Sequence, residues 1–143
     1  MVLCIPGRPA TKKNSPIPVR IRREGGKGSF VRIIPSAAYR RYLKSALKHL
    51  LPSKAHITGP VQVVALYWLP DLRWWPDLLG LEQATADILE AANIISSDRN
   101  IVSWGESRIA GLDKDFPRTE IRVVEVEPPD WWLLLNKSNK GKE

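Results

Sequence analysis

The sequence contains few of the residues that build disulfide frameworks and zinc clusters. It has one cysteine, Cys4, and two histidines, His49 and His56. A single cysteine cannot form an internal disulfide, and a zinc site built from several thiolates is excluded. The histidines lack the spacing of metal ligands, so the sequence assigns neither of them a role.

Long apolar runs are also absent. The longest lies near Val61 to Leu69, well below the roughly 20 residues that a membrane-spanning helix requires. The N-terminus shows no charged stretch followed by an apolar block, so no signal peptide is expected. The sequence therefore predicts a cytoplasmic protein that does not enter a membrane.

Acidic residues are scarce in the first half of the chain, where Glu24 is the only one before Asp71. Basic residues crowd the same stretch, and the whole chain carries a formal charge of +7. Such a surplus favours a polyanionic partner, of which nucleic acid is the commonest. A basic half followed by spaced acids is what a metal-dependent nuclease needs, because one surface must hold phosphates and another must hold cations.

The length of 143 residues and the 43% of hydrophobic residues indicate one folded domain. Apolar patterning predicts strands over Val2–Ile5, Val19–Ile21, Ser29–Ile34, Pro60–Leu69, Ile101–Ile109 and Arg118–Val126. Helical spacing predicts helices over Ala37–Leu51 and Leu78–Asn93, which begin at the N-caps Ser36 and Asp77. We expect an α/β fold: a single compact domain over residues 1–127, with a mixed β-sheet and two main helices packed on it, then a tail over 128–143.

The acids reappear in a segment that runs from a strand through a basic loop into a helix. It reads LPDLRWWPDLLGLEQATADILEAANIISSD over residues 69–98. This segment resembles the core of the RusA family of Holliday-junction resolvases, where a basic loop leads into Asp-Leu-Asp-Asn-Leu-x-Lys, a helix and an Asp-Asp pair. Asp77 matches the first aspartate of that motif, Asp87 an acid within the helix, and Asp98 the last acid. The stretch Pro9–Asn14 is similar to the family's proline-and-asparagine loop.

The resemblance implies a Mg²⁺-dependent endodeoxyribonuclease that resolves four-way DNA junctions in recombination and repair. It implies that Asp77 and Asp98 bind the metal and carry catalysis. Since a four-way junction has near two-fold symmetry and needs paired cuts, a homodimer is the expected assembly. The family pattern is altered at four positions, where Leu79, Gly80, Gln83 and Ser97 stand for its second aspartate, its asparagine, its lysine and the first acid of its Asp-Asp pair.

A third acid would strengthen a site of two carboxylates, because Mg²⁺ is held by a few carboxylates together with waters and phosphate oxygens. Asp87 lies ten residues beyond Asp77, about 15 Å along one helix, so these two cannot share an ion within that helix. Glu82 lies one turn past Leu79, and we hypothesise that it partly replaces the missing aspartate. Asp87 remains a catalytic candidate, with a plain helix-face acid as the alternative reading.

The distance between Asp77 and Asp98 raises a related question. The intervening helix is about 22 Å long, and the five residues after Asn93 extend over about 17 Å at most. The two acids meet in one chain only if that stretch runs nearly straight back, and otherwise the site is completed across a dimer interface. The alternative readings are a helix N-cap for Asp77 and a turn residue for Asp98.

Several basic and aromatic residues are candidates for DNA contacts. The proline-stiffened loop offers Lys12, Lys13 and Asn14 to phosphate oxygens. Arg73 and the aromatic pair Trp74 and Trp75 directly precede Asp77 and are placed to stack on unpaired bases at a branch point. The further candidates are Arg40 and Lys44 on the first helix, and Arg99. The alternative for the tryptophans is packing in the core or in a dimer.

Two other functions are compatible with the sequence. A catalytically impaired protein that binds branched DNA is favoured by Leu79 and Gln83. A protein-interaction module is the second, because residues 128–143 include the apolar run Trp131–Leu135. That run is expected to pack on its own domain, on a dimer mate or on another protein. Preferential, salt-dependent binding to branched DNA over linear duplex would exclude the interaction module.

Overall fold

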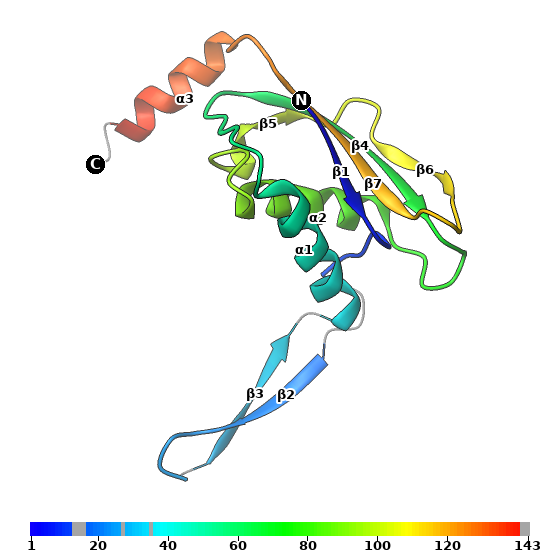
Figure 1. The fold of residues 1–143 in the computed structure, drawn as a ribbon. Helices are drawn as coiled ribbons and strands as arrows, with labels where there is room; N and C mark the ends of the chain where they lie inside the picture. The colour runs from blue at the N-terminus through cyan, green and yellow to red at the C-terminus, as the bar shows by residue number, and fades with distance from the viewer. Residues whose placement is uncertain (13–16, 27, 35, 141–143) are drawn as a thin grey trace.

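The computed structural model describes residues 1–12, 17–26, 28–34 and 36–140. The helices are α1 (Ala37–Leu50), α2 (Leu78–Ala91) and α3 (Asp130–Lys140), with a short 3-10 helix η1 (Asp98–Asn100). The strands are β1 (Val2–Pro6), β2 (Ile17–Arg22), β3 (Ser29–Ile34), β4 (Val61–Leu69), β5 (Ile101–Ser103), β6 (Arg108–Leu112) and β7 (Arg118–Glu125). Figure 1 shows one body in which helices lie against a sheet, and the β2–β3 hairpin projects from it. The predicted α/β class is confirmed.

The main sheet is mixed. Its strands follow the order β1, β7, β4, with β5 and β6 both on the far side of β4. β7 is antiparallel to β1 and to β4, whereas β5 and β6 are parallel to β4. The parallel pairing requires a crossover between β4 and β5, and α2 supplies it.

One face of the sheet is buried beneath α1 and α2. Residues of β4 alternate between buried and half-buried, as expected when one side of a strand packs on helices. Two buried hydroxyl pairs tie the helices to the sheet: Tyr42 in α1 to Thr119 in β7 at 2.6 Å, and Tyr67 in β4 to Thr85 in α2 at 2.7 Å. Each polar group in these pairs is satisfied inside the core, which is the condition for burying it without a penalty.

The expected strand over residues 101–109 is wrong in its middle. β5 ends at Ser103 and β6 begins at Arg108, with a turn between them that is closed by the Ser107 amide donating to the Trp104 carbonyl at 3.0 Å. The Ser107 hydroxyl oxygen accepts a hydrogen bond from the Ala65 amide at 2.9 Å, so a side chain replaces one step of the backbone ladder. Gly105 adopts φ +51° in this turn, a conformation that favours glycine.

The tail forms a helix, which the sequence prediction did not include. α3 places Trp132 against the body of the same chain, where 6% of its surface stays exposed. Trp132 thus packs on its own domain, one of the three alternatives for the run, whereas Trp131, Leu133 and Leu134 on the same helix remain exposed. Within the described part of the chain, no helix combines the length and apolarity needed to cross a membrane.

Candidate functional site

Three loops meet at the end of the sheet where β1 and β4 finish and β7 begins. The Gly7 amide, just after β1, donates to the Pro117 carbonyl at 2.9 Å. The Asp113 amide, just after β6, donates to the carbonyl of Leu69 at the end of β4 at 2.8 Å. The loop after β4 leads into α2 at Asp77. We call this region the loop end of the sheet.

The loop between β4 and α2 is fixed by a cluster of two arginines around Asp71. One Asp71 oxygen accepts from the Arg73 amide and from the Arg8 guanidinium, both at 2.9 Å, and the other lies 3.3 Å from the Arg73 guanidinium. Arg8 also donates to the Arg73 carbonyl. The Arg73 amide, ahead of the two guanidinium groups, holds the pKa of Asp71 below its usual range. The cluster therefore fastens this loop to the loop after β1.

The same loop presents apolar side chains to solvent. Trp74 is 76% exposed, Leu72 is also largely exposed, and Trp75 is about half exposed. Trp74 adopts φ +55°, and a left-handed backbone costs a bulky residue roughly 1–2 kcal/mol. Such outliers persist where the surroundings hold them, and they cluster at functional sites. Both tryptophan side chains are therefore accessible from solvent and do not belong to the core.

Asp77 begins α2 and lies at the surface directly behind the two tryptophans. It has extended backbone geometry, and its Oδ2 accepts a hydrogen bond from the Gly80 amide at 3.1 Å, so the predicted N-cap is confirmed. A Cβ at Gly80 would lie 2.6 Å from Asp77 Oδ1 and 3.0 Å from the Cγ2 of the fully buried Thr11. Glycine at position 80 therefore lets the loop after β1 and the Asp77 carboxylate both approach the first turn.

Replacing Gly80 with alanine should destabilise the fold, against the usual trend. Alanine gains about 1 kcal/mol over glycine in a helix, but here the new methyl displaces the Asp77 cap, worth about 1 kcal/mol, and also presses on Thr11. We expect a lower midpoint in urea unfolding. Gly59→Ala is the matched control, because nothing lies within 4 Å of a Cβ there, and it should unfold like wild type. A Gly80→Ala variant more stable than wild type would contradict this account.

Asp98 lies at the opposite end of the sheet from Asp77. The residues after α2 bind the segment before β4, with the Ile57 amide donating to Ile94 at 2.8 Å and the Ser96 amide donating to Ile57 at 2.9 Å. η1 then leads into β5, whose Ile101 pairs with Val61 at the start of β4. Since α2 is about 21 Å long at 1.5 Å per residue, the chain does not bring Asp77 and Asp98 together.

Asp87 is held in contacts with Lys12 and Gln83. The Lys12 ammonium lies 2.9 Å from one Asp87 oxygen, and the Gln83 amide donates to the other at 3.2 Å. The ammonium also lies 5.8 Å from the centroid of the buried Tyr39 ring. The hydrogen bond to Asp87 raises the pKa of Lys12. The sequence predicts a DNA contact for Lys12 and a catalytic role for Asp87, but it does not predict that these two residues pair with each other.

Glu82 is half-buried in α2, and burial raises the pKa of its carboxyl. A raised pKa in the folded state means that the native protein binds this proton more tightly than the unfolded chain does. Its contribution to stability is therefore greatest at low pH and falls as the pH rises through that pKa. A half-buried carboxyl with a raised pKa is compatible with two roles for Glu82. It could help to bind a metal, or it could be a plain acid on the helix.

Glu82→Gln should separate these two readings. The substitution removes the cost of burying a charged carboxylate, so the variant should be slightly more stable than wild type at pH 7. The difference should vanish at acidic pH, where Glu82 of the wild type becomes neutral as well. Chemical unfolding at pH 7 and at pH 4 measures this. If Glu82 helps to hold a metal, cleavage of DNA should fall in the same variant, and unchanged cleavage would refute the hypothesis that it replaces the missing aspartate.

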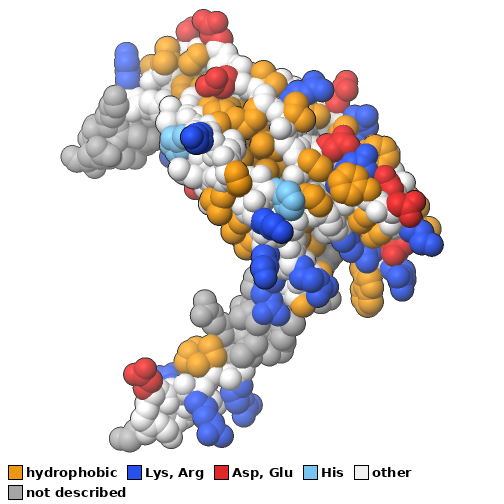
Figure 2. Space-filling model, viewed as in Figure 1, with side chains coloured by type: hydrophobic (Ala, Val, Ile, Leu, Met, Phe, Trp, Pro, Cys, Tyr) orange, Lys and Arg blue, Asp and Glu red, His pale blue; other side chains and the backbone are white. Residues whose placement is uncertain are grey.

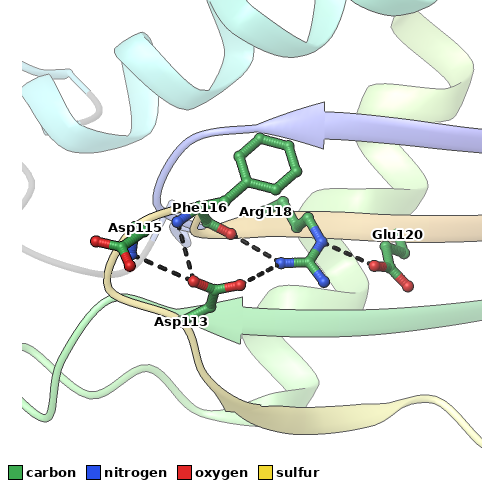
Figure 3. Close-up of polar contacts among 5 residues, drawn as sticks. All are labelled: Asp113, Asp115, Phe116, Arg118 and Glu120. Carbon is green, nitrogen blue, oxygen red and sulfur yellow. Dashed lines mark hydrogen bonds and ion pairs between the residues drawn. The ribbon is translucent and has the colours of Figure 1, made fainter.

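The loop between β6 and β7 is held by Arg118, as Figure 3 shows. Its guanidinium donates to Asp113 at 2.8 Å and to Glu120 at 2.7 Å, and it stacks between Trp68 and Phe116 at 4.8 and 5.1 Å from their ring centroids. The Phe116 amide, and then Arg118, hold the pKa of Asp113 below its usual range. This cluster shapes the loop end of the sheet, and no spacing signal in the sequence marked it.

The remaining predicted DNA contacts lie on two surfaces. Arg40 and Lys44 are exposed along α1 together with Arg41 and Lys48, and Figure 2 shows Lys and Arg side chains gathered over α1 and over the hairpin. Arg99 is exposed near Asp98 and lines a shallow hollow with Ser97 and Trp132. Lys13 and Asn14 lie outside the described residues.

The acidic residues do not form a ready metal site within one chain. Among residues 1–12, 17–26, 28–34 and 36–140, no three Asp, Glu, His or Cys side chains gather closely enough to hold an ion. Asp77 and Asp98 of one chain do not fit a shared Mg²⁺, because they lie at opposite ends of the sheet. A site that uses both acids requires a second subunit.

Models of known protein families give no match to this sequence, and neither do characterised proteins. The likeness to the RusA family therefore rests on the sequence resemblance alone and stays a prediction.

Proposed function

We propose that the protein is a structure-selective endonuclease that acts on branched DNA, such as a four-way junction, as a homodimer. The observation that carries this proposal is the loop before α2, where two exposed tryptophans and Arg73 directly precede the exposed Asp77. Aromatic faces next to cations favour unpaired bases beside phosphates, which a branch point offers and a linear duplex does not. A carboxylate next to such a surface is positioned to act on the DNA backbone.

The proposed active centre pairs Asp77 of one subunit with Asp98 of the other. Within a chain Asp77 caps the start of α2, and Asp98 lies seven residues beyond the last residue of that helix, Ala91. A two-fold axis that sets two such units side by side in opposite directions would bring Asp77 of each subunit toward Asp98 of the other, twice. That arrangement gives two equivalent centres, which matches the paired cuts that a junction requires. Action on DNA is consistent with the cytoplasmic location that the sequence predicts.

The first test is cleavage of an end-labelled four-way junction by the wild-type protein, with and without Mg²⁺. We expect symmetric nicks near the branch point that require the divalent ion, and little cutting of a linear duplex of the same sequence. Random cutting of all substrates, or cutting that persists in a chelator, would reject the proposal.

A second function, binding of branched DNA without cleavage, is favoured by the contacts of Asp87. Its two oxygens are engaged by Lys12 and Gln83, and Leu79, where the RusA motif has an acid, points 75% of its surface to solvent. Selective junction binding with no nicks in Mg²⁺ or Mn²⁺ would establish this function in place of the first.

A further inference from the structure

The β2–β3 hairpin is a basic arm that forms a sheet of its own. Among the described residues its strands pair with each other and not with the main sheet, in six antiparallel positions from Ile17 with Ile34 to Arg22 with Ser29. Figure 1 shows it extending away from the body at the start of α1. An isolated two-stranded hairpin is only marginally stable in water, so a bound partner is the expected source of its order.

The charge on the hairpin identifies the chemistry of that partner. Residues 17–34 hold five basic side chains and one acidic side chain, a formal charge of +4 out of +7 for the whole chain. Arg20 and Arg22 line a hollow on one face, and Arg23 lies over the Phe30 ring at 5.8 Å. Positive charge of this density repels itself in the free protein, and a polyanion neutralises it.

The shape of the hairpin favours the groove of a duplex. Two strands lie about 4.8 Å apart, and the major groove, about 12 Å wide, admits a two-stranded ribbon. The tip is thin, because Gly25, Gly26 and Gly28 adopt φ of +84°, +74° and +86° with open space around them. The base of the arm joins α1, whose exposed Arg40 and Lys44 continue the basic surface.

We propose that the β2–β3 hairpin is a duplex-binding arm that enters a DNA groove and contacts phosphates through Arg20, Arg22 and Arg23. This inference rests on the proposal that the protein binds DNA, and it adds where the duplex arms of the substrate are held. The loop end of the sheet would then face the branch point, while the hairpin grips the duplex that leads away from it.

The test compares three variants in binding to a labelled 30-base-pair duplex and to a four-way junction between 50 and 200 mM salt. The first replaces Arg20, Arg22 and Arg23 with glutamine, and the second replaces them with lysine. The third is the matched control Lys54→Gln/Arg122→Gln/Lys137→Gln, which removes the same charge from exposed positions elsewhere.

The plot of log affinity against log salt has a negative slope. Loss of three phosphate contacts should make that slope shallower by about 2 to 3, and duplex affinity should fall on the order of ten- to a hundredfold. The lysine variant should keep most of the affinity, and the control should keep its slope within one unit. A glutamine variant that matches the control would overturn the inference, as would equal losses in the glutamine and lysine variants.

Two further outcomes separate this inference from the proposed function. If wild type binds both DNAs but never cuts them, the endonuclease proposal fails. The salt slopes of the glutamine, lysine and control variants still decide whether the hairpin binds duplex. If the glutamine variant keeps its duplex affinity but loses single-strand binding, or becomes monomeric in light scattering while wild type is dimeric, the arm contacts something other than a groove and the inference fails.

Discussion

Asp77→Asn should abolish cleavage of a four-way junction while leaving the fold intact. In the proposed active centre Asp77 would balance the charge of a catalytic cation. Its removal would then forfeit several kcal/mol of transition-state stabilisation, so the rate should fall about a thousandfold or more. Asparagine is as good an N-cap as aspartate, and its side-chain oxygen can still accept the bond from the Gly80 amide. The cleavage rate and the urea midpoint of the same preparation provide the measurement and its control.

Mixing Asp77→Asn with Asp98→Asn tests whether each centre is shared between subunits. In a mixed dimer, one centre combines both substitutions and the other combines both natural acids. Random exchange yields about half mixed dimers, so about a quarter of the wild-type centres should return. Neither variant alone should cut. No recovery after verified subunit exchange would show that Asp77 and Asp98 do not act together across the interface.

The sequence predicted most elements of the fold because their signals are local. The N-caps Ser36 and Asp77 and the apolar spacing set both long helices to within two residues of their observed ends. The break between β5 and β6 could not be predicted, because it depends on the Ser107 side chain meeting β4, 42 residues away in sequence. α3 was missed since its helix is supported by Trp132 packing on a distant surface.

The candidate site was less predictable than the fold. Spacing alone identified Asp77, Trp74 and Trp75 as neighbours, because they are adjacent in sequence. Lys12 pairs with Asp87 across 75 positions of the sequence, and Arg8 pairs with Asp71 across 63. Local periodicity cannot predict contacts between residues so far apart. The length of the helix limits how closely Asp98 can approach Asp77, and this limit could be predicted from the sequence. The direction of the chain after α2 could not be predicted, because it depends on hydrogen bonds to the distant Ile57.

Trp74→Ala should weaken binding to the junction far more than binding to linear duplex. Stacking on a base contributes about 1–3 kcal/mol, so we expect junction affinity to fall roughly five- to 150-fold, while duplex, which offers no unpaired base, should bind as before. The side chain is 76% exposed, so its removal sacrifices little packing. Alanine keeps the Cβ atom that makes φ +55° unfavourable, so the cost of the left-handed backbone stays similar. Titration of both DNAs with the variant measures the difference.

A control variant and the salt dependence of binding distinguish base stacking by Trp74 from other effects of its removal. Trp131, 55% exposed on α3, is the matched tryptophan, and its replacement by alanine should change neither DNA affinity. Because stacking releases no counterions, Trp74→Ala should keep the wild-type slope against salt, unlike loss of the hairpin arginines. Equal weakening on junction and duplex would mean that Trp74 supports the shape of its loop and does not read unpaired bases, and branch selectivity would then have to arise from the spacing of the two subunits.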